Sequence, residues 1–235
     1  ERLRELLRAL ARTRPRRRSR RLRADRRGDV LDLRRLARAS LATGGDPAEL
    51  RFRRRASAPR RLVVLCDISG SMEPYARAIL LFAHALLQAG RGVEAFVFGT
   101  RLTRVTPALA HRDPDRALGA TSAGALDWAG GTRIGASLRA FNDGWGARGA
   151  VVVVVSDGLE IGDTSAVARE TARLRRESYA LLWLNPLKGR PDYEPLAGGM
   201  RAALPHVDRF LPAHDFESLE QLADAVAGVG ARHRV

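Results

Sequence analysis

Two uninterrupted apolar runs constrain the fold more than any other feature of this chain. Residues 62–66 read Leu-Val-Val-Leu-Cys, and residues 150–155 read Ala followed by five Val. A strand with one solvated face alternates apolar and polar residues, whereas a strand of a parallel sheet, buried on both faces, is apolar throughout. Both runs therefore predict inner strands of a mostly parallel sheet.

Segments with helical periodicity alternate with further strand-like segments after residue 61. The stripe of Ile79, Phe82 and Leu86 predicts a helix that Pro74 opens. We also predict helices at 135–145, 164–177 and 216–226, partial helix at 114–128, strands at 93–98, 102–106, 179–184 and 207–211, and a loop rich in Gly and Pro at 185–206. This alternation favours an α/β three-layer sandwich, in which helices flank a mostly parallel, Rossmann-like sheet.

The excess of positive over negative charge lies in the N-terminal part of the chain. The net charge is +15, and residues 1–61 carry 22 Arg against seven acidic residues, so the remaining residues are neutral overall. Such a basic segment has three interpretations: a solvated linker, a docking surface for an acidic protein, or a site for nucleic acid or acidic membranes.

We expect this basic extension to be partly helical. Its predicted segments are a helix over 1–12, a solvated linker over 14–27, a helix from Val30 to Ala42 with Asp29 as its N-cap, and a short strand over 50–55. The predicted domains are an Arg-rich extension of helices and linker over 1–59, a main domain over 60–228 and a tail over 229–235.

Cysteine content and hydropathy limit the compartment. The single cysteine, Cys66, excludes an internal disulfide framework and fits a reducing compartment. No apolar stretch approaches the roughly 20 residues of a membrane-spanning helix, so we expect a cytoplasmic protein without a transmembrane segment. Because the first residue is Glu1 rather than methionine, we expect the chain to be a fragment or a processed protein.

Oxygen-bearing side chains follow the ends of both apolar runs. Asp67, Ser69 and Ser71 come after the first run, Asp157 comes after the second, and Thr132 lies in a Gly-Gly-Thr turn before a predicted helix. Ligands of open α/β sheets bind at the carboxyl ends of the strands, so these segments can converge. Carboxylate and hydroxyl oxygens favour a magnesium-like cation, and their two negative charges leave it able to accept one further carboxylate.

Other polar residues near these segments are weaker ligand candidates. We expect Glu73 and Glu160 to be solvated loop carboxylates rather than ligands. The histidines show no spacing typical of a zinc site.

The five oxygen-bearing residues resemble a known motif. Asp67-x-Ser69-x-Ser71 with Thr132 and Asp157 is similar to the metal-ion-dependent adhesion site of the von Willebrand factor A (VWA) domain, over about residues 60–228. The resemblance implies that the serines and the threonine bind Mg²⁺ or Mn²⁺ directly or through water, that the aspartates often act through water, and that a partner's Asp or Glu completes the coordination shell.

The residues around the motif suggest a subgroup. The phrase from Leu65 to Glu73 resembles bacterial intracellular members, and the Arg-rich lead with Leu41-Ala42-Thr43-Gly44-Gly45 resembles the CoxE-like subgroup. That resemblance implies a non-enzymatic interaction module that acts with a MoxR-type AAA+ ATPase. It also implies a metalloenzyme client under maturation, such as carbon monoxide dehydrogenase.

Two alternative functions remain at this stage. The basic N-terminus could bind nucleic acid, although Phe52 is the only aromatic residue before Tyr75 and single-strand binding uses aromatic stacking; we therefore expect nucleic acid to be an unlikely partner. A metal-dependent hydrolase could use the same cation to activate water. No nearby histidine, second metal cluster or phosphate-binding glycine loop favours the hydrolase.

Overall fold

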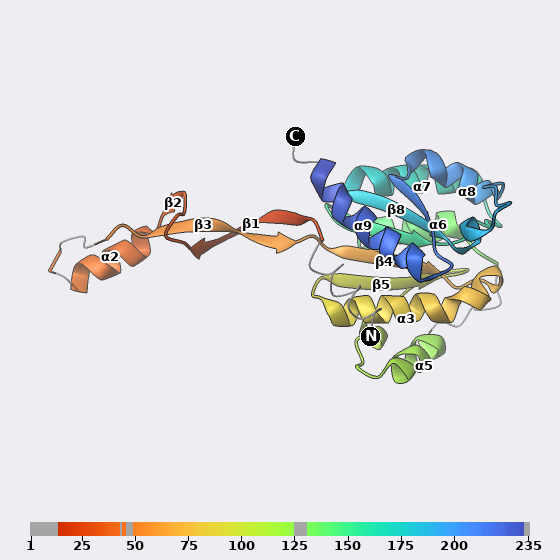
Figure 1. The fold of residues 1–235 in the computed structure, drawn as a ribbon, viewed down its shortest axis with the longest axis horizontal. Coiled ribbons are helices and arrows are strands. Elements are labelled where there is room, and N and C mark those ends of the chain that lie inside the picture. Colours follow the sequence, from red (N-terminus) through yellow and green to blue (C-terminus); the bar gives the residue numbers. More distant parts are fainter. Residues whose placement is uncertain (1–13, 43, 46–48, 125–130, 233–235) are drawn as a thin grey trace. The chain divides into compact units, whose positions relative to one another are not determined.

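The computed structural model describes residues 14–42, 44–45, 49–124 and 131–232 (Figure 1). The chain divides into two compact units. The smaller unit is Arg16–Pro59, and the described residues before and after it form the larger unit. Among the described residues, no helix is both long enough and apolar enough to cross a membrane.

A six-stranded sheet forms the centre of the larger unit. Its strands are β4 (Leu62–Asp67), β5 (Val93–Phe98), β6 (Leu102–Arg104), β7 (Val151–Val155), β8 (Ala180–Asn185) and β9 (Arg209–Pro212). They lie in the order β6-β5-β4-β7-β8-β9, and every pairing is parallel except that of β5 with β6. The predicted mostly parallel sheet is confirmed, and the two apolar runs are its adjacent inner strands β4 and β7.

Helices cover both faces of this sheet, as Figure 1 shows. They are α3 (Glu73–Ala89), α4 (Thr106–Leu109), α5 (Pro114–Gly124), α6 (Ile134–Gly144), α7 (Thr164–Glu177), α8 (Gly198–Ala203) and α9 (Phe216–Arg232). Helices α3, α4, α5 and α9 contribute buried side chains to one hydrophobic core, and α6, α7 and α8 contribute to the other. This arrangement is the predicted three-layer α/β sandwich.

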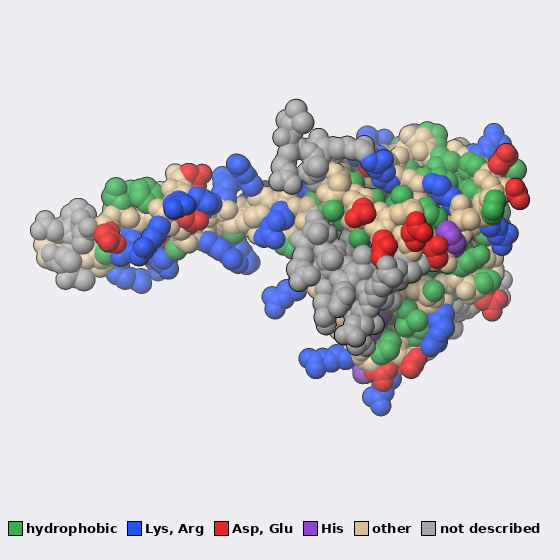
Figure 2. Space-filling model, viewed as in Figure 1, with side chains coloured by type: hydrophobic (Ala, Val, Ile, Leu, Met, Phe, Trp, Pro, Cys, Tyr) green, Lys and Arg blue, Asp and Glu red, His purple; other side chains and the backbone are tan. Residues whose placement is uncertain are grey.

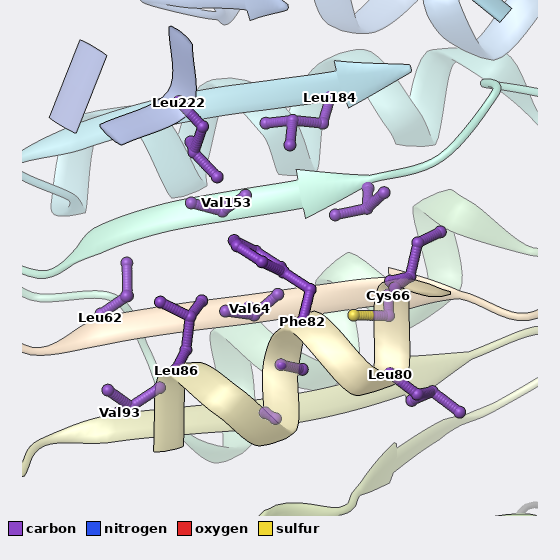
Figure 3. Packing of buried hydrophobic residues seen from close by; sticks show 14 of the residues in the cluster. Leu62, Val64, Cys66, Leu80, Phe82, Leu86, Val93, Val153, Leu184 and Leu222 are labelled. Carbon is purple, nitrogen blue, oxygen red and sulfur yellow. The ribbon is translucent and has the colours of Figure 1, made fainter. Parts of the chain in front are cut away.

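The pleat of β4 sends successive side chains into opposite cores. Val64 packs in the core that contains Phe82 of α3 (Figure 3), whereas Val63 and Leu65 belong to the opposite core. Since both faces of the strand are covered, a polar side chain before Asp67 would be buried without a partner, and β4 is accordingly apolar up to that residue.

The direction of strand addition reverses between β4 and β7. From β4 the chain adds β5 and β6 on one side, and then returns to add β7, β8 and β9 on the other. Ligands of such sheets bind outside the carboxyl ends of the strands at this switch point. Asp67 ends β4 and Ser156 directly follows β7, so both residues lie at the switch point.

Some segments of the larger unit differ from the prediction. The strand expected at 102–106 is the shorter, antiparallel edge strand β6. The loop expected at 185–206 contains α8 and the 3₁₀ turns η2 (Pro186–Gly189) and η3 (Leu204–His206). These elements are too short to show a helical period in the sequence. The partial helix expected at 114–128 is α5, and residues 125–128 lie outside the described residues.

A small antiparallel sheet and one helix make up the smaller unit. Its elements are β1 (Arg16–Ala24), β2 (Val30–Leu31), α2 (Leu33–Ala42) and β3 (Phe52–Pro59), with the strand order β1-β3-β2. Strand β1 pairs with β3 along its length, with an irregularity between Arg18 and Leu22. The prediction of a linker over 14–27 is therefore wrong, although the side chains of this segment are mostly exposed to solvent, as predicted. Backbone hydrogen bonds to β3, which is distant in the sequence, hold this segment as a strand, and the sequence has no alternating apolar pattern that would predict this strand.

Helix α2 begins later than predicted. The prediction placed its first residue at Val30 with Asp29 as the N-cap, but Val30 belongs to β2. Asp32 caps the helix instead, since its Oδ1 accepts the Arg35 backbone N–H at 3.1 Å. The Arg53 guanidinium, which donates to the same oxygen at 2.5 Å, lowers the pKa of Asp32. The helix predicted over 1–12 lies outside the described residues.

Candidate metal centre

Asp67 is the innermost residue of the candidate site. Its surface is completely buried. The Ser69 backbone N–H donates to its Oδ1 at 2.9 Å, and the Ser156 hydroxyl donates to its Oδ2 at 2.6 Å. The strand register explains the second contact: Cys66 of β4 lies opposite Val155 of β7, so the residues that follow these two meet at the edge of the sheet.

The turn after β4 brings the two predicted serines together. Ser69 Oγ and Ser71 Oγ are 3.3 Å apart. Ser69 is buried and Ser71 is exposed, so the pair of hydroxyls extends from the interior to the surface. Met72, which is buried, fixes the end of the turn because its backbone N–H donates to the Ser69 carbonyl at 2.9 Å.

Asp157 lies near Asp67 on the other side of the switch point. It is only 3% exposed, and its Oδ1 accepts the Leu159 backbone N–H at 3.0 Å. Its backbone carbonyl accepts the side-chain N–H of Asn185, at the end of β8, at 3.2 Å. The charge of Asp157 raises the pKa of Asp67, so the two carboxylates interact electrostatically.

Backbone contacts bring Thr132 to the same edge of the sheet. The Thr132 carbonyl accepts the Ile161 backbone N–H at 3.0 Å, which ties its loop to the segment after Asp157. The backbone N–H of Arg133 donates to the carbonyl of Gly99, directly after β5, at 2.9 Å. Thr132 itself is buried. Asp67, Ser69 and Ser71 are thus linked by direct hydrogen bonds, and Asp157 interacts with Asp67 electrostatically. Backbone hydrogen bonds of Thr132 and Arg133 hold the Thr132 loop at the same edge of the sheet.

Asp67 and Asp157 are two buried carboxylates that have no arginine or lysine ion-pair partner among the described residues. Burial is the largest influence on Asp67 and, with the charge of Asp157, raises its pKa to about 6, although hydrogen bonds from Ser156 and Ser69 act in the opposite direction. Among the described residues, no arginine or lysine is ion-paired with either carboxylate. Buried charges in proteins are paired or coordinate metals, so the pair fits a bound cation.

The set of donors determines which cation would fit. In the described part of the chain, no three His, Cys, Asp or Glu side chains gather as a possible metal site. A cation at this site would therefore depend on hydroxyl oxygens in addition to the two carboxylates. Such an all-oxygen set suits Mg²⁺ or Mn²⁺ better than metals that prefer nitrogen or sulfur ligands.

Sequence analysis missed the residues that support the candidate ligands. Ser156 holds Asp67, and its Oγ also accepts the Gly158 backbone N–H at 3.0 Å. Asn185 holds the backbone of Asp157 and donates to the Tyr193 hydroxyl at 2.8 Å. Ser156 directly follows β7 at the switch point and Asn185 ends the next strand, β8, so their position at the carboxyl ends of strands was the available signal.

The two glutamates near the site have different environments. Glu73 is exposed in the first turn of α3. Glu160 is half-buried: its Oε2 accepts the Gly135 backbone N–H in the first turn of α6 at 2.9 Å, and its Oε1 accepts that of Gly162 at 2.6 Å. Glu160 is thus a loop carboxylate that is only partly solvated, because it also accepts backbone N–H groups from the first turn of α6 and from its own loop.

A cavity of about 510 Å³ adjoins the candidate centre. Asp157 lies in its wall together with Leu187, Arg190 and Tyr193. The cavity therefore combines apolar surface, a guanidinium and one of the candidate ligands. A side chain of another molecule could enter it beside the candidate metal position.

We expect Ser156→Ala to raise the pKa of Asp67 above about 6 in the metal-free protein. The substitution removes a hydroxyl that donates to the Asp67 carboxylate and so favours its charged form. The pKa is measured by NMR titration of the Asp67 carboxyl carbon. Ser137→Ala is the matched control, because the buried Ser137 hydroxyl has no hydrogen-bond partner among the described residues. An unchanged Asp67 pKa in Ser156→Ala would contradict the role given to this hydroxyl.

The chain matches one family model over most of its length. The family model described as VWA domain containing CoxE-like protein matches residues 3–219. No curated protein matches the chain. The family match covers both the oxygen-bearing residues and most of the Arg-rich N-terminal segment.

Several solved structures are similar at low identity. One is proximal thread matrix protein 1 from the mussel byssus, with a TM-score of 0.48 and 13% identity over 72% of this chain and 47% of that chain. Another is an aerotolerance-related membrane protein from Bacteroides fragilis, with a TM-score of 0.44 and 15% identity over 74% and 99%. A third is the VWA domain of SpRpn10, with a TM-score of 0.43 and 12% identity over 71% and 94%. The chain spans about half the length of the mussel protein.

Proposed function

Because this chain belongs to the family of CoxE-like proteins that contain a VWA domain, we propose that it is a metal-dependent protein-interaction module. The observation that carries this proposal is the buried pair Asp67 and Asp157, which lacks a compensating arginine or lysine among the described residues. VWA domains are generally interaction modules, and we propose a non-enzymatic role here as well.

Five residues would hold the metal in this proposal. They are Asp67, Ser69, Ser71, Thr132 and Asp157, all in the domain that we propose to span residues 60–228. The metal, Mg²⁺ or Mn²⁺, would supply an electrophilic position that accepts a carboxylate of a partner protein. Ser156 would orient Asp67, and Asn185 would fix the backbone at Asp157, which are the tasks of residues around a metal site.

The partner is proposed from the chemistry of the site and from the family. A partner segment that presents Asp or Glu at the metal could place a neighbouring side chain in the cavity beside Asp157. Membership in the CoxE-like family favours a MoxR-type AAA+ ATPase as the partner and a metalloenzyme under maturation, such as carbon monoxide dehydrogenase, as the client. We place this activity in the cytoplasm.

Partner recovery under four conditions tests the proposal. Wild type and Ser69→Ala/Ser71→Ala, each with Mg²⁺ or with EDTA, are used to capture a MoxR-type ATPase and candidate metalloenzymes. We expect recovery with wild type in Mg²⁺ and at least a tenfold loss in the other three conditions, since removing two hydroxyl ligands or the metal removes the contact. Equal recovery in all four conditions would show that no metal bridge exists.

A further inference from the structure

Helix α2 of the smaller unit exposes its apolar side chains. Leu33 is 67% exposed and Leu41 is 84% exposed. Leu36 is half-buried and Ala37 is exposed, so the stripe at positions i, i+3, i+4 and i+8 is largely open to solvent. An amphipathic helix of a folded unit normally buries this stripe. Its exposure here marks a surface for contact with another molecule.

Positive charge surrounds this apolar stripe. Arg34, Arg35 and Arg38 are exposed on α2. Residues 16–59 contain 15 arginines and only five acidic residues, so at least ten guanidinium charges have no acidic counterpart within the unit. In the part of Figure 2 that shows this unit, blue side chains are more extensive than red ones, and green side chains form a patch beside them.

Two acidic residues of the unit also stabilise its own fold. Asp32 caps α2 and pairs with Arg53, and Asp25 pairs with Arg54 at 3.5 Å. The charge that remains around α2 is therefore available to an acidic partner. A surface with an apolar centre and a charged rim has the anatomy of a protein interface.

We propose that α2 docks in an apolar groove with an acidic rim on a partner protein. Leu33, Leu36 and Leu41 are the anchors, in the manner of a helix that lays its apolar face into a groove. The arginines of α2 and of the neighbouring strands pair with the rim. This surface does not include any candidate metal ligand, and the contact is independent of the metal centre.

Two other occupants fit the observations less well. A nucleic-acid duplex would use the arginines for its phosphates but would leave Leu33 and Leu41 exposed. An anionic membrane would take up an apolar stripe, yet α2 is only ten residues long and carries no aromatic side chain, whereas membrane-surface helices present Trp, Phe and Leu. An apolar groove with an acidic rim would bury the apolar stripe of α2 and also pair with the arginines around it.

Calcium-loaded calmodulin supplies a defined probe, because it presents an apolar groove for basic amphipathic helices and closes that groove without calcium. Binding of the full chain to calmodulin is measured by fluorescence anisotropy with calcium and with EGTA. We expect binding only with calcium, and at least a tenfold loss in Leu33→Ser/Leu41→Ser. Leu196→Ser is the matched control, since Leu196 is equally exposed but lies in the larger unit.

Parallel measurements distinguish the alternatives. Because Leu33 and Leu41 are exposed, the double variant should keep the thermal unfolding midpoint of the wild type, which is checked first. Calmodulin binding that the double substitution leaves unchanged overturns the proposal. The proposal is also overturned if a 30-bp DNA duplex binds the wild type and the double variant equally well while calmodulin binds neither of them. A third result that overturns it is that phosphatidylglycerol vesicles bind the wild type more tightly than calmodulin does and fail to bind the double variant.

Discussion

Asp67→Asn is expected to abolish Mn²⁺ binding and, at the same time, to stabilise the metal-free protein at pH 7.5. The two effects have opposite signs because the buried charge of Asp67 strengthens metal binding but lowers the free energy of unfolding of the metal-free protein. Asn keeps the size of the side chain, and its amide oxygen can accept the Ser69 N–H while its NH2 group donates to the Ser156 hydroxyl oxygen, but it removes a buried negative charge. We expect at least a 100-fold loss of Mn²⁺ affinity, measured by isothermal titration calorimetry.

The stability effect follows from the raised pKa of Asp67. Its pKa of about 6 in the folded, metal-free protein exceeds the ordinary value of 3.8. Between these two pH values the folded state binds more protons than the unfolded state, so the free energy of unfolding of the wild type falls as the pH rises through this range. The difference corresponds to at most about 3 kcal/mol above pH 6. We expect the variant to gain part of this amount there and to gain nothing below pH 4.

Urea unfolding at pH 4, 5, 6 and 7.5, in the presence of EDTA, measures this gain. Asp115→Asn is the control, because the Asp115 side chain is 79% exposed and should show no such pH dependence. A variant that is less stable than wild type at pH 7.5, or a gain in stability that is the same at every pH, would refute the idea that the ionised Asp67 carboxylate destabilises the metal-free protein. A variant that keeps its Mn²⁺ affinity would refute the metal centre itself.

The larger unit was predictable because buried strands and helices require characteristic patterns of apolar residues in the sequence. Strands covered on both faces must be apolar, and helices over a sheet repeat their apolar residues every three or four positions, so β4, β7 and α7 were located to within a residue or two. The candidate ligands were recognisable because they follow those strands directly. Their convergence on one edge then followed from the topology of a parallel sheet.

The elements that the sequence did not predict lack such a pattern of apolar residues. Strand β1 has six arginines among its nine residues, and it is a strand because β3 offers backbone partners 29 to 43 positions away in the sequence. Helix α8 is six residues long and begins with two glycines. Ser156 and Asn185 act through a few specific hydrogen bonds, which produce no periodic pattern in the sequence. Interactions between distant segments, rather than local propensity, decide all of these features.

Gly158→Ala is expected to destabilise the protein by about 2–5 kcal/mol. Gly158 has φ +83°, a left-handed conformation that costs a residue with a Cβ about 1–2 kcal/mol. A Cβ there would also lie 2.6 Å from the Met200 Cβ and 2.9 Å from the Met200 backbone in α8. Overpacking of this kind costs about 1–3 kcal/mol more, because the backbone of a buried helix cannot move aside easily.

Gly92→Ala separates the two contributions. Gly92 has φ +76°, but a Cβ at this position meets no atom within 4 Å. Its substitution should therefore show the backbone strain alone, and the excess destabilisation of Gly158→Ala should report the contact with Met200. Both values come from urea unfolding at one pH with EDTA. Equal losses in the two variants would mean that α8 does not pack against the loop after β7. Because Gly158 also donates to Ser156 Oγ, which holds Asp67, we further expect Gly158→Ala to weaken Mn²⁺ binding and Gly92→Ala to leave it unchanged.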